Sequence, residues 1–252
     1  KAHNLYSIQR QQEYFDNSVT LILPMLLDEN KQLFVAGNMG DVNGLCKLMV
    51  FNNKTDEEIL KIDEESKESI LDNICDLNHE KALKFLSSIT SEAFLMKRLF
   101  SSSRYNLTPI EAAMRQCRHL SVKYLLSITA VQQRYLSDLR ARWRLIYWTF
   151  GGGDQILIDF VLNTLQISKQ DILSLLKQEY IEEEPQQFAV IAIKYHKDNI
   201  VCSAAGNKHD GVLRKLVSLI GEEQFCEFAF RDTKKKMNAI EYCAKSNNLK
   251  AM

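Results

Sequence analysis

The stretch Thr108-Pro-Ile-Glu-Ala-Ala-Met-Arg-Gln-Cys-Arg-His-Leu-Ser-Val-Lys-Tyr-Leu-Leu126 decides the fold of this chain. Thr108 is suited to cap a helix N-terminus, and Pro109 is suited to the first helical position. Glu111, three residues after Thr108, completes a capping box. A short turn at residues 116–118 then interrupts the apolar helical spacing before a second amphipathic run. The segment therefore predicts two short helices joined by a tight turn.

The same pattern recurs along the chain. Comparable segments begin near residues 31, 69, 108, 144, 199 and 238, so successive starts are 38, 39, 36, 55 and 39 residues apart. Capping-box spacing returns in two of them, as Ser69 with Asp72 and as Asn238 with Glu241. The copy at 144 is weak, because Thr149-Phe150 stands where the others have small residues. Such a period predicts a repeat architecture.

The longest interval, between the copies at 144 and 199, contains additional residues. Ser168 and Asp171 predict a helix to about residue 180, and Pro185 is suited to open another over 186–196. We therefore expect an inserted helical segment. The expected domains are an N-terminal helical cap or linker at 1–30, repeats at 31–162, inserted helices at 163–198, and repeats at 199–252, the last one truncated.

Composition agrees with a helical, turn-poor chain. The 252 residues include only 9 Gly and 3 Pro, which disfavours an all-β sandwich or barrel. Lys plus Arg (32) balance Asp plus Glu (32), so no global charge marks a nucleic-acid or membrane partner. The six cysteines lie at least 17 residues apart, which excludes C-x-x-C zinc or redox spacing and fits a reducing, cytoplasmic location. No apolar run is long enough to span a bilayer.

The Thr-Pro-Ile-Glu-x-Ala segment and its turn resemble the ankyrin repeat, whose first helix carries Thr-Pro-Leu-His-x-Ala. The resemblance covers about residues 31–252 and is degenerate, because Glu111 and Glu241 stand in place of the His. Four residues stand where the motif has its turn Gly: Asn78, Cys117, Lys208 and Asn247. The resemblance implies an all-α solenoid of helix-turn-helix repeats. The period exceeds the ankyrin value of about 33 residues, so we expect longer loops between hairpins.

Candidate chemical sites are few. Three Cys/His pairs lie close in sequence: Cys75 with His79, Cys117 with His119, and Cys202 with His209. Each Cys falls at a repeat position and no catalytic motif surrounds it, so we expect core or turn roles. Gly151–Gly153 is followed by Asp154 instead of the Lys of a phosphate-binding loop, and predicts a permissive turn. We expect no catalytic, cofactor-binding or metal-binding residues in this chain.

Arginine and aromatic residues gather at Arg140-Ala-Arg-Trp-Arg144, followed by Tyr147 and Trp148. Arg and Trp are enriched at binding hot spots and also serve single-stranded nucleic acid binding, while a helix with inward tryptophans and solvated arginines is the structural alternative. In an ankyrin-like array, Arg104-Tyr105 and Lys234–Lys236 would lie on projecting fingers before two repeats. The candidate partner-binding residues are Arg104, Tyr105, Arg115, Arg140, Arg142, Trp143, Lys234, Lys235 and Lys236.

Charge is also separated along the chain, which could steer a partner. Segment 55–68 contains seven acidic residues against two lysines, whereas segment 140–144 is basic. The alternative is ordinary solvation of loops.

The resemblance implies a function in protein–protein recognition through the concave face and loops of the solenoid. Because the chain begins with Lys1 and stops inside a repeat, we expect it to be the targeting part of a longer protein. Its long loops and Lys-, Asn- and Ile-rich style resemble ankyrin-repeat effectors of intracellular bacteria or viruses, which implies a host protein as partner. Ankyrin scaffolds of eukaryotes are the competing source. The rival hypotheses are an enzyme whose catalytic domain lies upstream or in the inserted region, and a non-ankyrin helical solenoid.

Overall fold

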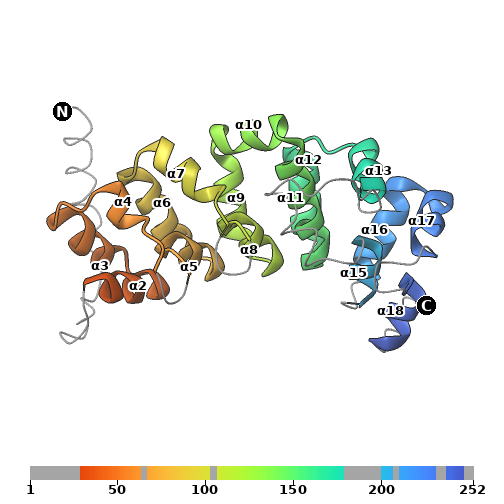
Figure 1. Ribbon diagram of the computed structural model, residues 1–252, viewed down its shortest axis with the longest axis horizontal. Coiled ribbons are helices and arrows are strands. Elements are labelled where there is room, and N and C mark those ends of the chain that lie inside the picture. Colours follow the sequence, from red (N-terminus) through yellow and green to blue (C-terminus); the bar gives the residue numbers. More distant parts are fainter. Residues whose placement is uncertain are drawn as a thin grey trace. The chain divides into compact units, whose positions relative to one another are not determined.

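The computed structural model describes residues 29–63, 67–102, 107–178, 200–206, 210–230 and 237–246. In these ranges all regular secondary structure is helical (Figure 1), so the predicted all-α class is confirmed. The expected N-terminal cap at residues 1–30 lies outside the described residues, apart from Glu29 and Asn30, which begin the first described helix.

The helices follow one order in each repeat: a first helix, a tight turn, a second helix and a third helix. The first helices are α2 (Glu29–Met39), α5 (Ile70–Asp76), α8 (Pro109–Arg115), α11 (Leu139–Gly152), α15 (Ile200–Gly206) and α18 (Ala239–Lys245). The second helices are α3 (Val42–Cys46) with its π-helical continuation η1 (Lys47–Phe51), α6 (Glu80–Ile89), α9 (His119–Ser127), α12 (Gln155–Thr164) and α16 (Asp210–Ile220). The third helices are α4 (Asp56–Ile59), α7 (Glu92–Leu99), α10 (Thr129–Ser137), α13 (Lys169–Gln178) and α17 (Glu222–Ala229). Residues expected to form longer loops are therefore helical, and they account for the long period.

Helix α13 lies in the segment 163–198 that the sequence suggested as an insertion. It begins at the predicted capping box, where the backbone N–H and the hydroxyl of Ser168 both donate to Asp171 Oδ2 at 2.7 Å. Because α13 follows its second helix as α7, α10 and α17 follow theirs, we assign it to the fourth repeat. The additional length lies at residues 179–199, outside the described residues.

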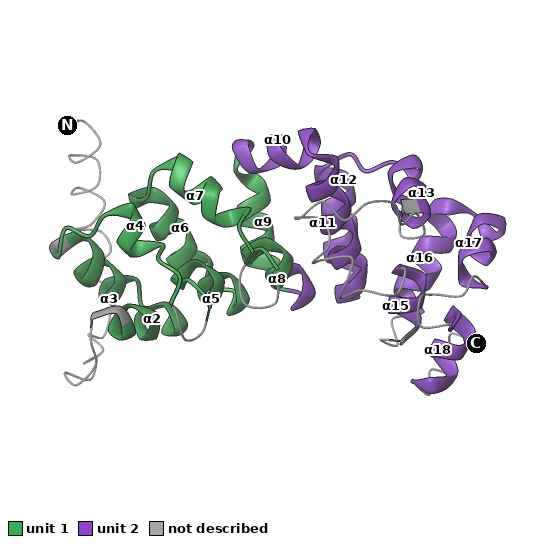
Figure 2. Cartoon of the chain, in the orientation of Figure 1, with its two compact units in different colours: residues 1–113, 118–128 green, residues 114–117, 129–252 purple. Residues whose placement is uncertain are grey.

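The chain divides into two compact units (Figure 2). Unit 1 comprises residues 1–113 and 118–128, and unit 2 comprises residues 114–117 and 129–252. In unit 1, α2 packs beside α5, and α6 packs between α3 and α9. In unit 2, α15 packs between α11 and α18, while α12 packs beside α16. Within each unit, first helices therefore stack on first helices and second helices on second helices, as in a solenoid.

Small residues on the first helices permit this close stacking. Ala36, Ala113, Ala204 and Ala205 are fully buried. Larger apolar residues fill the space between the helix layers, as predicted from their spacing: Leu33, Leu45, Leu71, Ile74, Leu83, Leu86, Ile110, Met114, Val122, Leu125, Leu126, Val201, Val212 and Leu216 are each at most 2% exposed. Each such aliphatic side chain contributes about 1.5–3 kcal/mol when it is fully buried.

The last described helix departs from this pattern. Cys243 on α18 is 3% exposed, but Ile240 is 41% exposed. Ala244 is exposed as well, so two apolar residues of α18 remain accessible. The reason is that, among the described helices, α18 packs extensively only against α15.

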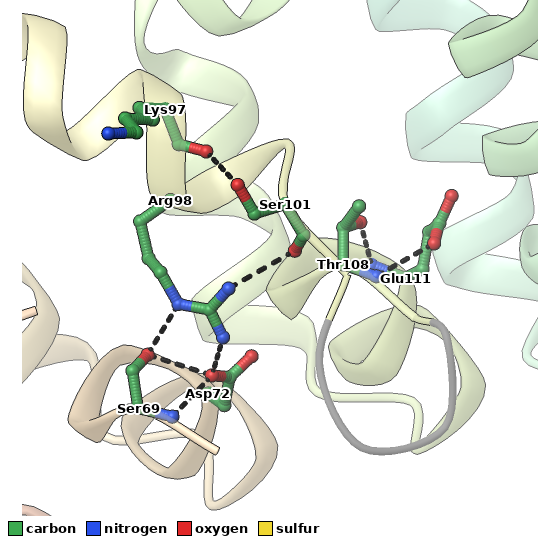
Figure 3. A network of polar contacts seen from close by, with 7 residues as sticks. All are labelled: Ser69, Asp72, Lys97, Arg98, Ser101, Thr108 and Glu111. Carbon is green, nitrogen blue, oxygen red and sulfur yellow. Dashed lines mark hydrogen bonds and ion pairs between the residues drawn. The ribbon is translucent and has the colours of Figure 1, made fainter. Parts of the chain in front are cut away.

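Capping boxes begin the helices where the sequence predicts them. Thr108 N donates to Glu111 Oε2 at 2.8 Å, and Asn238 N donates to Glu241 Oε2 at 2.8 Å. Ser69 N donates to Asp72 Oδ2 at 2.7 Å (Figure 3). A cap of this kind contributes about 1 kcal/mol. These bonds join residues only three apart, which is why the sequence reveals them.

A further capping box, not predicted, begins α4. Thr55 N and Thr55 Oγ1 donate to Glu58 Oε2 at 2.7 and 2.8 Å. The backbone hydrogen bond from Thr55, and then the bond from its hydroxyl, lower the pKa of Glu58 from its ordinary value. This carboxylate therefore stays ionised to lower pH than an ordinary Glu.

The turn between first and second helix is a Schellman motif, which closes on a left-handed residue. In the first three hairpins the N–H after that residue donates to the carbonyl five residues earlier, at 2.9, 3.1 and 2.8 Å. The left-handed residues are Gly40, Asn78, Cys117 and Gly153, with φ of 65°, 63°, 55° and 82°. These are the turn positions given by the repeat register, and the weak copy at 144 shares the geometry.

Side chains of the turns connect neighbouring hairpins. In unit 1, Asn78 Oδ1 accepts hydrogen bonds from the N–H groups of Leu120 and Ser121, at 2.9 and 3.0 Å. His79 Nε2 lies 2.8 Å from the carbonyl oxygen of Asn38 in the preceding turn. These bonds set the register between hairpins, and they span about 40 residues of sequence.

The three glycines at 151–153 differ in backbone conformation and surroundings. The predicted turn at these residues is confirmed. Gly153 is left-handed. A Cβ on Gly152 would lie 2.5 Å from the carbonyl oxygen of Met114, so only glycine allows this close approach. The carbonyl of Gly152 also accepts a bond from Cys117 Sγ at 3.1 Å. A Cβ on Gly151 would meet no atom closer than 3.9 Å, which is ordinary van der Waals contact, so this position tolerates a methyl group.

Candidate protein-binding face

The predicted Arg–Trp cluster begins α11, and its side chains have different surroundings. Arg142 is 15% exposed at its side chain, and its Nη2 lies 3.3 Å from Asp171 Oδ2. The same nitrogen donates to the carbonyl oxygens of Leu165 and Gln166 at 3.2 and 3.3 Å. Arg142 thus joins the end of α12 to the start of α13, and little of its guanidinium remains for a partner.

Trp143 is partly buried and packs against the core of unit 2, which includes Ile146 and Phe150. Its indole Nε1 is buried without a hydrogen-bond partner. Trp143 therefore has the inward position that the sequence allowed as the structural alternative.

Arg140 and Arg115 are both exposed. Arg115, at the end of α8, places its guanidinium carbon 6.0 Å from the centroid of the Trp148 ring on α11. This distance is at the outer range of a cation–π contact. Trp148 is 7% exposed and meets the ring of Tyr147 edge-on, with centroids 5.2 Å apart. The pair of Arg115 and Trp148 was not predicted, since 33 residues separate its members.

The remaining candidate residues lie outside the described residues. They are Arg104, Tyr105, Lys234, Lys235 and Lys236. Their assignment to projecting fingers stays a prediction.

The repeat register shows which other residues share the face of Arg115 and Trp148. Lys245 on α18 is the seventh residue after its cap, as Arg115 is after Thr108, and it is exposed. Ser203 on α15 lies close to Trp148, because a Cβ on Gly151 would lie 3.9 Å from Ser203 Oγ and 3.9 Å from Trp148 Cε3. Tyr242 occupies the position of Trp148 in its own repeat and packs on the unit 2 core. We define the unit 2 inner face as Arg115, Trp148, Gly151, Ser203, Tyr242 and Lys245.

Arginines extend this face along α11. Arg140 and Arg144 precede Trp148 by eight and four residues, so they share its stripe of the helix. The register position of Arg115 and Lys245 is occupied by Asn38 in the first repeat and by Asp76 in the second repeat. Both of these residues belong to unit 1. The basic character therefore belongs to the first helices of unit 2, and it does not continue along those of unit 1.

The described members of the Cys/His pairs contact core or turn groups. Cys75 is fully buried, and burial raises its pKa well above the ordinary value, with the charges of Asp72 and Asp76 acting in the same direction. His79 Nε2 contacts the carbonyl oxygen of Asn38 in the preceding hairpin, and Cys117 Sγ donates to the carbonyl of Gly152. His209 lies outside the described residues. Among the described residues, no group of three His, Cys, Asp or Glu side chains is placed to bind a metal ion.

Comparison with solved structures gives matches to 41 chains. No family model and no curated protein matches this chain. Among solved structures, the human ASB11 ankyrin repeat domain is similar, with 14% sequence identity over 87% of this chain and 95% of that domain, and a TM-score of 0.44.

The description as an ankyrin-like array rests on the chain's own repeated caps, left-handed turns and stacked first helices. In the part of the chain that the structure describes, no helix has the length and apolar character needed to cross a membrane.

Proposed function

We propose that this chain is a protein-interaction module that binds its partner through the unit 2 inner face. An ankyrin-like array has an extended face suited to recognition of another protein. The observation that carries the proposal is the exposed Arg115 over the nearly buried Trp148, beside Gly151, where a methyl group would fit without a clash. A rigid aromatic ring under an accessible guanidinium is the type of anchor that dominates binding energy at interfaces.

The finger residues predicted from the sequence extend the proposed interface. Lys234–Lys236 precede α18, which carries Lys245, and Arg104-Tyr105 precede α8, which carries Arg115. Each of these segments therefore precedes, in the sequence, a first helix that carries a cation of the unit 2 inner face.

The stylistic resemblance to effectors supports a finer proposal: the chain is the targeting part of a longer protein, and its partner is a protein of the host cytosol. Its basis is the sequence resemblance alone.

Affinity capture from source and host cytosol tests the proposed face. The immobilised chain is compared with the variant Arg115→Ala/Arg140→Ala. The control is Lys177→Ala/Arg214→Ala, which removes two exposed cations of α13 and α16, outside the first helices. We expect the first variant to lose the captured protein and the control to retain it. Equal capture by all three proteins would reject the unit 2 inner face as the interface.

A further inference from the structure

We infer that the unit 2 inner face binds an acidic peptide segment of its partner, in which carboxylates lie on both sides of an apolar residue. The inference rests on the proposed function and names the chemistry of the partner. Its basis is the distribution of charged groups around Trp148.

Among the described residues, the cations of the face are exposed, whereas several nearby carboxylates bond to other groups. Arg115, Arg140 and Lys245 are all exposed. Two of the nearby carboxylates already cap helices: Asp138 accepts from the N–H groups of residues 140 and 141, both at 3.1 Å, and Asp154 accepts from Leu157 N at 2.8 Å.

Of the other carboxylates that the structure describes in this region, Asp210 has a buried Oδ1 without a hydrogen-bond partner, whereas two more are bonded to other groups. Glu241 accepts from Asn238 N at 2.8 Å. Asp138 additionally pairs with Arg134 at 2.9 Å, and Asp159 pairs with Lys215 at 2.7 Å. The face therefore presents positive charge that a carboxylate-bearing partner complements, and such complementarity sets partner choice.

Geometry favours carboxylates as the ligand of Arg115. A guanidinium that lies over an aromatic ring keeps its planar N–H groups accessible at the ring's edge, where they bind a carboxylate in a bidentate manner. Beside it, Gly151 leaves room bounded by Ser203 and the ring of Trp148. A methyl-sized group fits here at van der Waals distance, so we expect an apolar side chain of the partner at this point, with its carboxylates directed to Arg115 and to Lys245 on α18.

Nucleic acid fits the same face less well. Proteins that bind single strands stack bases on exposed aromatic faces. Trp148 is only 7% exposed and lies under Arg115, so its ring is not available to a base. The chain as a whole has no net charge, whereas nucleic-acid-binding domains have a strong basic footprint.

A random peptide library tests the inference with the full chain as bait. Twelve-residue peptides displayed on phage are selected on the wild type, on Arg115→Glu/Lys245→Glu, and on the control Lys177→Glu/Arg214→Glu. We expect wild type and control to enrich Asp and Glu on both sides of an apolar residue. The Arg115→Glu/Lys245→Glu variant is expected to enrich Lys and Arg, and to bind the acidic peptides at least about tenfold more weakly. Circular dichroism checks that each bait is folded.

Three results would overturn the inference: selected peptides without Asp and Glu, the same acidic peptides selected by the Arg115→Glu/Lys245→Glu variant, or tighter binding of a 12-nucleotide oligothymidylate with the same dependence on Arg115. The capture experiment separates this inference from the proposed function. If capture depends on Arg115 and Arg140 but the acidic peptide does not compete with it, the face binds protein and only the acidic chemistry is wrong. If capture is independent of both arginines, the proposed function itself fails.

Discussion

Arg98 on α7 forms a buried ion pair with Asp72 on α5, and each side chain is only 6% exposed. Arg98 Nε also donates to Ser69 Oγ at 2.8 Å, and this hydroxyl donates to Asp72 Oδ2 at 2.7 Å (Figure 3). A guanidinium of the third helix therefore binds the capping box of the first helix. The third helix is fastened to the hairpin by this network, with a further bond from Arg98 Nη1 to the carbonyl of Ser101 at 3.3 Å.

Removal of Arg98 tests this network. We expect Arg98→Met to lower the free energy of unfolding by about 3–5 kcal/mol, because it leaves the buried Asp72 carboxylate without its countercharge. Asp72→Asn in the same chain should restore part of the loss. Arg134→Met breaks the ion pair with Asp138, in which the Arg134 side chain is 52% exposed. It should lower the free energy of unfolding by at most about 1 kcal/mol. Urea unfolding followed by circular dichroism measures all three, and an equal effect of Arg98→Met and Arg134→Met would contradict the structural role given to the network.

The three consecutive glycines give an ordered stability series. Gly152→Ala should destabilise unit 2 by about 1–3 kcal/mol, because its methyl group would overlap the carbonyl of Met114. Gly153→Ala should lower the free energy of unfolding by about 1–2 kcal/mol, because the backbone at this position is left-handed. Gly151→Ala should leave the free energy of unfolding unchanged. Tryptophan fluorescence is a suitable probe, because both tryptophans of the chain lie in unit 2. The order is wrong if Gly151→Ala is the most destabilising of the three.

Asn78 combines a left-handed backbone with a side chain that bonds the next hairpin. Asn78→Gly keeps the backbone geometry and loses the bonds to Leu120 and Ser121, so it should cost about 1–3 kcal/mol. Asn78→Ala loses the bonds and adds left-handed strain, and should cost about 1–2 kcal/mol more. The comparison by urea unfolding separates the two contributions. Equal stability of the two variants would show that strain at this turn is negligible.

Cys117 is left-handed without the amide side chain that makes Asn tolerant of this conformation. We expect Cys117→Gly to stabilise the chain by about 1 kcal/mol, as relief of backbone strain outweighs loss of the weak S–H bond to Gly152. A thermal midpoint unchanged or lowered in Cys117→Gly would show that the thiol contact is the stronger of the two effects.

The buried thiol of Cys75 predicts loss of stability in alkali. Burial, and then the charges of Asp72 and Asp76, hold its pKa in the folded chain above the ordinary value. Its contribution to stability is therefore fully present below the pKa of the unfolded thiol, about 8.5. It is lost as the pH rises above that value toward the pKa of the folded chain. Cys75→Ala should flatten the fall in urea midpoint above about pH 8.5 relative to the wild type. Parallel curves for the two proteins would contradict this assignment.

Local signals in the sequence were sufficient for most first helices and the turns, although the fourth repeat was expected to begin near residue 144 and α11 begins at Leu139. Ser69 with Asp72, Thr108 with Glu111 and the left-handed positions depend on bonds between residues three to five apart. Helix α13 was found for the same reason, because its cap lies three residues from its acidic partner. By contrast, α7 is capped at Ser91 by Asp56, whose Oδ2 accepts from Ser91 N and Oγ at 3.0 and 2.6 Å from 35 residues away. A hydrogen-bond acceptor that comes from another repeat leaves no pattern among the residues next to Ser91. The sequence therefore predicts a loop where the structure has α7.

The residues of the candidate face were also predicted only in part from the sequence. The sequence alone identified an all-α repeat, its turn positions and a segment rich in Arg and Trp, because helix periodicity and caps are properties of neighbouring residues. The tertiary structure decided which of those side chains remain accessible. Stacking of repeats directed Arg142 to the end of α12 and Trp143 into the core, and brought Arg115 over Trp148 from another repeat. Such contacts depend on the lateral packing of helices about one period apart, for which no short-range pattern of residues is diagnostic.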